Sequence, residues 1–334
     1  MRVAFLIHSM EVSGCRYRVL QYLPYLQGQG VETSIHLFPK RASDKLKLYR
    51  SLARYDLFFV HRRLFPPVEF WYLRRQAKRI VFDFDDAIMY RSSRSRNPYS
   101  LSRRIKFGYM IRRMDYIIAG NAFLKSEVLP YNPKVEVIPT SIELSQYGEG
   151  DSETKKGPVT VGWIGSHSTL QYLEGLMPIL ERIYEVCPHF QLKIVCDQFL
   201  ESPSVPVIKK AWSAKDEEAD LRSFDIGLMP LTDDPWSRGK CGLKILQYST
   251  VGVPVVCSPV GVNRDLVRDG VNGFWATHEG EWKEKLLCLI REEKLRREMG
   301  ERGRRLVEEG YTVNVNAPRI YALLKMVCRE GKGA

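Results

Sequence analysis

Residues 233–261, DDPWSRGKCGLKILQYSTVGVPVVCSPVG, place three cations beside two glycines. Arg238, Lys240 and Lys244 stand where a helix is expected to begin, near Gly242, ahead of the apolar strand VPVVCS. The free N–H groups and the dipole of a helix start favour an anion, and glycine lets a ligand approach the backbone closely. Because each charged hydrogen bond contributes about 1.5–3 kcal/mol, three cations predict a diphosphate rather than a monoanion.

Lys240, Lys244 and Gln247 are spaced i, i+4 and i+7, so a continuous helix would present them on one face. The alternative is that these lysines are ordinary surface cations that face solvent. Lysines seldom cluster beside glycines at the start of a buried strand, and we therefore favour anion binding.

The hydrophobic pattern predicts the elements that must position these residues. Short apolar runs, typical of β-strands, alternate with stretches that have the apolar spacing of helices. The runs span residues 2–7, 33–38, 56–61, 79–84, 116–120, 135–139, 159–165, 190–196, 205–211, 225–231, 253–258 and 272–276. Such alternation is typical of parallel sheets covered by helices on both faces.

The polar segment YGEGDSETKKGPVT divides these runs into two groups and is read as a linker. We therefore expect an α/β fold with two doubly wound, Rossmann-like domains, residues 1–150 and 158–315, facing a central cleft. Residues 316–334 form a C-terminal helix, for which packing back on the first domain is one arrangement. Ligands of open α/β sheets bind at the carboxyl ends of strands, so the cleft is the expected site.

The composition excludes several classes of protein. The length of 334 residues fits about two domains. No apolar run reaches the 18 residues typical of a membrane-spanning helix, and the start MRVAFLIHSMEVSG lacks the pattern of a secretory signal. The seven cysteines are scattered and form no CxxC pair, which indicates neither a disulfide framework nor a zinc site. We expect a cytoplasmic protein.

The net charge of +12 lies entirely in residues 1–150, which hold 25 Lys and Arg against 13 Asp and Glu. Such asymmetry indicates an anionic partner, which is an acidic membrane surface, an acidic acceptor or nucleic acid. The chain has no recognisable nucleic-acid-binding motif, so we expect no nucleic acid partner.

Basic residues are interleaved with large apolar ones in residues 61–80 and 102–116, a pattern typical of membrane interfaces. The charges include Arg103, Arg104, Lys106, Arg112 and Arg113, and the apolar neighbours include Phe65, Phe70, Trp71 and Phe107. We expect peripheral contact with an acidic membrane, at its inner face.

Residues 238–274, RGKCGLKILQYSTVGVPVVCSPVGVNRDLVRDGVNGF, resemble the donor-binding signature of retaining glycosyltransferases with the GT-B fold, the large family 4 group. The resemblance covers nearly the whole chain and is strongest at 225–275. Gln247 stands where the family has a glutamate that binds the nucleotide ribose, and an amide can still bond its hydroxyls. Gly239 stands where a second glutamate contacts the donor sugar, so recognition of that sugar must differ.

A second departure concerns the diphosphate. The family places an Arg and a Lys after the first strand of the second domain, where this chain has Trp163 and Thr169. The resemblance implies that the lost charge is supplied from residues 238–244 instead. Neutral donors at the same helix start are offered by Gly165, Ser166 and His167, with an ordinary surface loop as the alternative for His167.

The segment SMEVSGCRYRVLQYLPYL, after the first strand, resembles the family's glycine-containing loop, which faces the donor phosphates. By this resemblance Gly14 permits close approach, and Arg16 or Arg18 reaches an anionic donor or acceptor.

The segment RIVFDFDDAIMY places Asp83, Asp85 and Asp86 at the end of a strand. Read alone, it fits a metal-binding DxD motif, the nucleophile strand of a haloacid-dehalogenase phosphatase, or a structural cap. The first two need acidic partners at a later strand end, which the sequence does not show. By the resemblance, Asp85 takes the place of a histidine beside the donor sugar, where a carboxylate bonds hydroxyls or steadies positive charge at the anomeric carbon.

The resemblance implies a metal-independent hexosyltransferase, of use in polysaccharide biosynthesis, that moves a sugar from a nucleotide-diphosphate donor to a glycan or lipid-linked acceptor with retention. The nucleotide sugar is its substrate, and no cofactor is expected. Asp85, Lys244 and Arg238 are the expected catalytic residues. The donor is expected on the second domain and the acceptor on the first. The alternatives are a non-catalytic nucleotide- or glycan-binding protein and a phosphatase that uses Asp83 and Asp85.

Overall fold

The computed structural model describes residues 1–148 and 157–329 and divides them into two compact units. The first unit comprises Met1–Ser141, Asp234–Cys241 and the described part of the segment that begins at Val313. The second unit comprises the described parts of Ile142–Asp233 together with Gly242–Thr312. The chain therefore passes between the units more than once, and the segment 234–241 belongs to the first.

The first unit is built on a parallel sheet of six strands in the order β2-β1-β3-β4-β5-β6. The strands are β1 (Arg2–Ile7), β2 (Glu32–Leu37), β3 (Leu57–His61), β4 (Ile80–Phe84), β5 (Tyr116–Ala119) and β6 (Val135–Val137). Because side chains alternate along a strand, Ala4 and Leu6 of β1 join one buried cluster, whereas Val3, Phe5 and Ile7 join another. Both faces of this sheet are thus covered.

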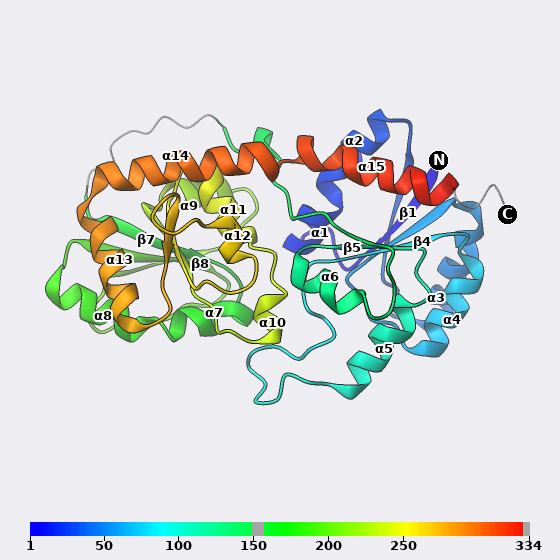
Figure 1. Cartoon of the computed structure of the whole chain (residues 1–334), viewed down its shortest axis with the longest axis horizontal. Coiled ribbons are helices and arrows are strands. Elements are labelled where there is room, and N and C mark those ends of the chain that lie inside the picture. Colours follow the sequence, from blue (N-terminus) through cyan, green and yellow to red (C-terminus); the bar gives the residue numbers. More distant parts are fainter. Residues whose placement is uncertain (149–156, 330–334) are drawn as a thin grey trace. The chain divides into compact units, whose positions relative to one another are not determined.

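Helices cover those two faces (Figure 1). One cluster receives side chains from α3 (Ala42–Ser51), α4 (Pro67–Gln76), α5 (Leu101–Ile111) and α6 (Ala122–Val128). The other receives them from α1 (Ser13–Arg18), α2 (Leu23–Gly28) and α15 (Val313–Arg329). Short 3-10 turns span Leu20–Tyr22 and Leu52–Arg54.

The C-terminal helix α15 belongs to the first unit and lies beside α2 (Figure 1). Its apolar side chains, including Ile320 and Leu324, are buried in the same cluster as Phe5 of β1. Asn316 donates a hydrogen bond of 2.9 Å to the hydroxyl of Ser141, and both side chains are fully buried. The last helix is therefore part of the first unit's core.

The second unit holds another parallel sheet of six strands, in the order β12-β11-β10-β7-β8-β9. The strands are β7 (Val159–Ile164), β8 (Phe190–Cys196), β9 (Val207–Ala211), β10 (Ile226–Met229), β11 (Val255–Cys257) and β12 (Gly273–Trp275). The central strands β7 and β10 carry buried residues at nearly every position, as expected for strands covered on both faces.

The helices of the second unit differ widely in length. They are α7 (His167–Glu174), α8 (Met177–Val186), α9 (Glu217–Arg222), α11 (Leu243–Thr250), α12 (Asn263–Leu266), α13 (Glu279–Arg291) and α14 (Glu293–Gly310), with a 3-10 turn at Leu144–Gln146. The connection between β10 and α11, residues 230–242, contains α10 (Pro235–Arg238), which belongs to the first unit. Helix α11 packs against β10 and α14.

All twelve strands predicted from the apolar runs are confirmed, with ends that differ by up to two residues. The α/β fold with two doubly wound sheets is confirmed as well. The unit boundary differs from the expected division at 150 and 158, since the first unit ends at Ser141 and takes in residues 234–241. Most of the expected linker lies outside the described residues. In the described chain, no helix is both long and apolar enough to span a bilayer.

Candidate functional site

Asp83, the last polar residue inside β4, is buried in the first unit and fully engaged. Its carboxylate forms an ion pair with Arg18 of α1 and lies 2.8 Å from Nδ1 of His61 at the end of β3. Arg18 also donates a hydrogen bond of 2.7 Å to the carbonyl of Ile138. Burial alone would lower the pKa of Arg18, but the charge of Asp83 and its hydrogen bond raise it above the usual value.

This burial decides between the alternatives for Asp83. A side chain only 1% exposed, with both carboxylate oxygens bound to Arg18 and His61, does not offer a nucleophile to a substrate. Asp83 is a structural residue that ties α1 to the ends of two strands. The structure therefore gives no support to the phosphatase alternative.

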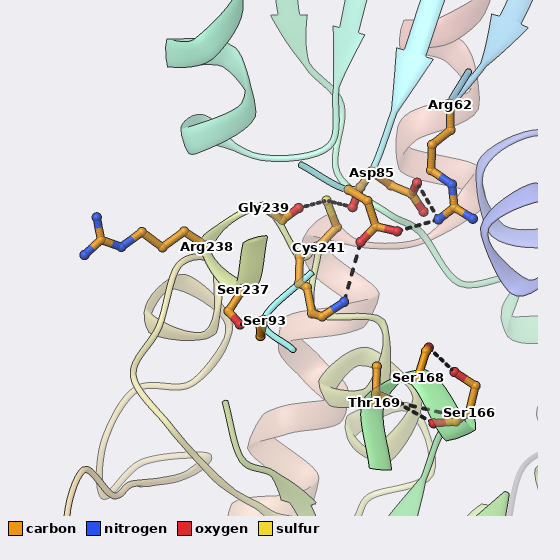
Figure 2. Close-up of polar contacts among 12 residues, drawn as sticks. Arg62, Asp85, Ser93, Ser166, Ser168, Thr169, Ser237, Arg238, Gly239 and Cys241 are labelled. Carbon is orange, nitrogen blue, oxygen red and sulfur yellow. Dashed lines mark hydrogen bonds and ion pairs between the residues drawn. The ribbon is translucent and has the colours of Figure 1, made fainter. Parts of the chain in front are cut away.

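Asp85 and Asp86 follow β4 and share one cation (Figure 2). Nη1 of Arg62 lies 3.2 Å from Oδ1 of Asp85 and 2.6 Å from Oδ2 of Asp86. Arg62 has a φ of 46°, the only positive φ of a non-glycine residue in the described chain. Such a conformation costs about 1–3 kcal/mol and is concentrated at functional sites.

The electrostatic surroundings keep Asp85 ionised. Burial would raise the pKa of its carboxyl, but the charges of Arg62, His61 and Arg18 bring that pKa below its ordinary value. Nε2 of His61 lies 4.0 Å from Oδ1 of Asp85, and it is buried without a hydrogen-bond partner in the described chain. Asp85 is therefore a fixed negative charge at the carboxyl edge of the first sheet.

The segment 234–241 brings further residues to this edge. Nζ of Lys240 lies 3.6 Å from Oδ1 of Asp86, and the thiol of Cys241 donates to the carbonyl of Asp85 at 3.2 Å (Figure 2). The amide of Asn121, the N-cap of α6, donates to the carbonyl of Lys240 at 2.9 Å. Burial, and then the nearby aspartates, raise the pKa of the Cys241 thiol well above its usual value, so this thiol is a packed hydrogen-bond donor.

Close packing explains why a glycine stands at position 239. A methyl group at Gly239 would lie 2.4 Å from Cβ and 2.8 Å from the backbone nitrogen of Ala87. Any larger side chain would force the segment away from Ala87. The glutamate that the resembled family has at this position is thus sterically excluded here.

The other expected residues of the first unit differ in whether they approach Asp85. A methyl group at Gly14, the second residue of α1, would meet Nη1 of Arg62 at 3.1 Å and Oδ2 of Asp85 at 3.2 Å. Arg16, also on α1, has its guanidinium 5.3 Å from the ring centroid of Tyr17. The exposed side chain of Arg238 extends away from Asp85 (Figure 2). The structure thus brings Gly14 to Asp85 and does not bring Arg238 there.

In the second unit, Gly165, Ser166 and His167 follow β7 and form the start of α7, as expected. The structure adds Asp197, which follows β8. One oxygen of Asp197 accepts from the backbone N–H of His167 at 2.7 Å, and the other lies 2.6 Å from Nδ1 of the His167 ring. These hydrogen bonds lower the pKa of Asp197 to about 2. The imidazole is thereby oriented by a carboxylate.

The serine and threonine hydroxyl groups at this helix start have partners within the helix start itself. The Ser166 hydroxyl lies 2.8 Å from that of Ser168, and Oγ1 of Thr169 donates to the carbonyl of Ser166 at 3.1 Å (Figure 2). Thr169 is therefore a helix-capping residue, which accounts for its type without a ligand.

Helix α11 begins after Gly242, whose φ of 68° is favourable for glycine alone. A one-face set of Lys240, Lys244 and Gln247 was expected, and it is wrong. Lys240 precedes the turn at Gly242 and belongs to the first unit, so only Lys244 and Gln247 are on the helix. The turn is possible because Gly242 is left-handed, and it ends the helical spacing.

The two residues on α11 occupy different environments. The ammonium of Lys244 lies 4.9 Å from the ring centroid of buried Trp163, a cation–π contact, and the residue is half-buried. Gln247 is 4% exposed. Tyr248 fixes the helix, since its hydroxyl donates to the carbonyl of Leu228 at 3.3 Å and accepts from the N–H of Ile164 at 3.2 Å. The position of Lys244 is thus set by the core of this unit.

Four residues of these sites were not predicted from the sequence, namely His61, Arg62, Cys241 and Asp197. A signal existed for two of them, because the histidine of HRR ends an apolar run and the arginine directly follows that run, as Asp85 follows another. Carboxyl ends of neighbouring parallel strands meet at one edge. The sequence indicates Asp197 less clearly, because it is a single acidic residue after the apolar run FQLKIVC. The described residues include no group of three or more His, Cys, Asp or Glu side chains placed to hold a metal ion.

Part of the chain matches a known protein family, and nearly the whole chain is similar to solved structures. Residues 218–306 match the family described as glycosyl transferases group 1. A comparison with curated proteins found no match. Sucrose-phosphate synthase from Thermosynechococcus elongatus is similar in structure, with a TM-score of 0.78 and 13% identity over 98% of each chain.

Two further solved structures are similar over nearly their whole length. The Anabaena protein HepE, in complex with UDP and glucose, has a TM-score of 0.73 and 15% identity, over 98% of this chain and 100% of its own. A glycosyltransferase from Rickettsia africae has a TM-score of 0.70 and 11% identity over 98% of each chain. Residues 218–306 therefore carry the sequence pattern of group 1 glycosyltransferases, in a chain with the two parallel sheets of the GT-B fold.

Proposed function

We propose that the protein is a metal-independent hexosyltransferase that moves a sugar from a nucleoside-diphosphate donor to a glycan or lipid-linked acceptor, with retention at the anomeric carbon. The observation that carries this proposal is the match of residues 218–306 to group 1 glycosyltransferases, because it includes Lys244 and Gln247. The similarity to HepE, which was solved in complexes with UDP and with UDP-glucose, makes uridine nucleotides the first donors to test.

In this proposal the second unit holds the donor. Lys244 bonds to the diphosphate and Gln247 to the ribose, while the left-handed Gly242 sets where α11 begins, next to the nucleotide. Gly165, Ser166 and His167 add donors at the start of α7. Asp197 fixes the His167 ring through Nδ1, so that Nε2 is directed to the ligand.

In this proposal the first unit has two roles. It supplies the charge that acts on the sugar, and it binds the acceptor. Asp85 is ionised and held by Arg62, and a fixed carboxylate stabilises the positive charge that develops at the anomeric carbon. The lack of a side chain at Gly14 lets Arg62 and Asp85 lie close to α1. The departing phosphate takes the proton of the acceptor hydroxyl on the same face of the sugar. Arg238 and Arg16 are proposed phosphate ligands.

Lys240 has a different task in this proposal. Its ammonium faces Asp86, and the aspartates 83, 85 and 86 are matched by three cations, Arg18, Arg62 and Lys240. Its charge is therefore largely balanced within the first unit. Lys240 contributes to donor binding by holding the segment 234–241, which precedes α11.

We further propose a cytoplasmic location with peripheral contact at the inner face of an acidic membrane. The support is the charge of residues 1–150. Such contact would suit a lipid-linked acceptor.

The test of the function combines binding and turnover. A thermal-shift screen of UDP-, GDP-, ADP- and dTDP-sugars identifies the donor, and release of the nucleoside diphosphate is then followed with and without excess EDTA. We expect one nucleotide class to stabilise the fold, and release to persist in EDTA. NMR of the product's anomeric proton checks retention. Stabilisation without any release, with or without acceptor glycans, would favour the non-catalytic binder, whereas strict magnesium dependence would contradict the proposed mechanism.

A further inference from the structure

The first unit has an arginine-lined groove between α4 and the end of α5, with a volume of about 440 Å³. It is lined by Trp71, Arg74, Arg75, Arg112, Arg113, Met114 and Asp115. Four arginines and one carboxylate face it, so the lining has a marked excess of positive charge.

Most of that charge is not neutralised by the protein. Asp115 accepts from Arg74 and Arg79 and from the N–H of Ile80 at 2.7 Å, so its own charge is matched. Arg75, Arg112 and Arg113 are exposed, and none has a carboxylate within ion-pair distance in the described chain. Instead, their guanidinium groups lie over aromatic rings, those of Trp71, Tyr131 and Tyr109 in that order.

The groove lies away from the proposed reaction site within the first unit. Ile80 is the first residue of β4 and Asp115 directly precedes β5. These are the amino ends of the strands, whereas Asp85 follows the carboxyl end of β4. The arginines therefore cannot act on the group that reacts beside Asp85.

Apolar residues next to the arginines indicate a surface rather than a small ion. Trp71 is 47% exposed and Val68, three residues earlier on α4, is 79% exposed. With Arg75 they follow i, i+3 and i+7 spacing, so they share one face of the helix. An indole and an apolar side chain beside unpaired arginines are typical of segments that lie at a lipid headgroup region.

We propose that this groove binds the phosphate groups of anionic phospholipids and docks the first unit on an acidic bilayer. Each guanidinium group can donate two parallel hydrogen bonds to the oxygens of one phosphate, while Trp71 and Val68 enter the headgroup region of the bilayer. The proposal deepens the membrane contact proposed above. It does not rest on sugar transfer, and its test measures lipid binding alone, so either can fail while the other stands.

The structure separates core residues from exposed ones among the four apolar neighbours of the basic residues. Phe65, Phe70 and Phe107 are at most 2% exposed and belong to the core, which leaves Trp71 of the original four. Arg103 and Arg104 bond to Tyr90 rather than lining the groove.

The test is co-sedimentation of the full chain with phosphatidylcholine vesicles, with and without phosphatidylglycerol. The variant Arg75→Gln/Arg113→Gln removes one groove charge from each helix. Because each basic residue near an acidic surface contributes about fivefold in affinity, we expect the loss of two to weaken binding about 30-fold. The control Arg291→Gln/Arg297→Gln removes the same charge from exposed arginines of α13 and α14 and should bind like the wild type.

A second readout uses Trp71 itself. Its emission should shift to the blue on acidic vesicles, and the shift should be absent in Trp71→Phe. Equal losses in both arginine pairs would overturn the proposal, since they would show attraction by net charge alone. Binding to phosphatidylcholine alone with the same affinity would also overturn it, as would full competition by glycerol phosphate, which would identify a site for a soluble phosphate.

Discussion

Nη1 of Arg62 lies 3.2 Å from Oδ1 of Asp85, and Arg62 makes this contact from a left-handed backbone with a φ of 46°. The two residues follow β3 and β4, which are adjacent and parallel with His61 opposite Asp83. The strained residue is thus part of what fixes the charge of Asp85 in place.

The strain at Arg62 is testable with two small residues. Both Arg62→Ala and Arg62→Gly lose the bonds to Asp85 and Asp86, but only glycine adopts a positive φ without strain. We expect Arg62→Gly to be more stable than Arg62→Ala by about 0.5–1 kcal/mol, after the larger chain entropy of glycine is subtracted. Urea unfolding of the two variants measures the difference. Alanine equal to or better than glycine would show that no strain is stored there.

Asp85→Asn should abolish sugar transfer and leave nucleotide affinity nearly unchanged. The substitution keeps the size of the side chain and removes the charge that we propose acts on the anomeric carbon, whereas the proposed nucleotide contacts, Lys244 and Gln247, belong to the other unit. Turnover and UDP titration calorimetry provide the two readouts. Asp86→Asn is the matched control and should retain measurable transfer. If both variants transfer sugar equally well, Asp85 has only a structural role.

The lowered pKa of Asp85 predicts how stability depends on pH. A carboxyl group whose pKa falls below its ordinary 3.8 on folding stabilises the folded state at all pH values well above 3.8. That contribution is lost as the pH drops below about 4 towards the folded-state pKa. Asp85→Asn lacks this group, so its melting temperature should fall less than that of the wild type between pH 5 and about pH 3. Parallel curves would mean that the pKa of Asp85 is not lowered.

Lys244→Ala should weaken binding of a nucleoside diphosphate about 10- to 100-fold and leave nucleoside binding nearly unchanged, because it removes a charged phosphate contact. Gln247→Ala should weaken the binding of both, through the ribose. Calorimetric titration with UDP and uridine separates the two effects. An unchanged nucleoside affinity in Gln247→Ala would show that the alignment of Gln247 to the ribose-binding glutamate is wrong.

Gly239→Ala should destabilise the protein by about 1–3 kcal/mol, because the added methyl group meets Ala87 at 2.4 Å in a packed site. Gly175→Ala is the matched control. Gly175 has a φ of −62°, and the nearest atom to its added methyl group is 3.7 Å away, so the change should be neutral or slightly stabilising. Thermal unfolding measures both, and equal effects would contradict the steric account of position 239.

The sequence by itself determined the two sheets. Runs of residues that alternate between apolar and polar, or that are apolar throughout, specify strands through local hydrophobicity. All twelve predicted strands lie where these runs occur. It also determined that Gly242 would precede a helix and that Gly165, Ser166 and His167 would begin another. These features depend on neighbouring residues, which a sequence displays directly.

Only the tertiary structure decided which side chains meet. Asp83 and Asp85 are two residues apart, yet one is sealed by Arg18 and His61 while the other binds Arg62. Lys240 and Lys244 have helical spacing, yet a left-handed glycine separates them and the first pairs with Asp86. Such partners come from strand ends and loops far apart in the chain. Their choice depends on packing and on the pairing of buried charges, which local spacing does not encode.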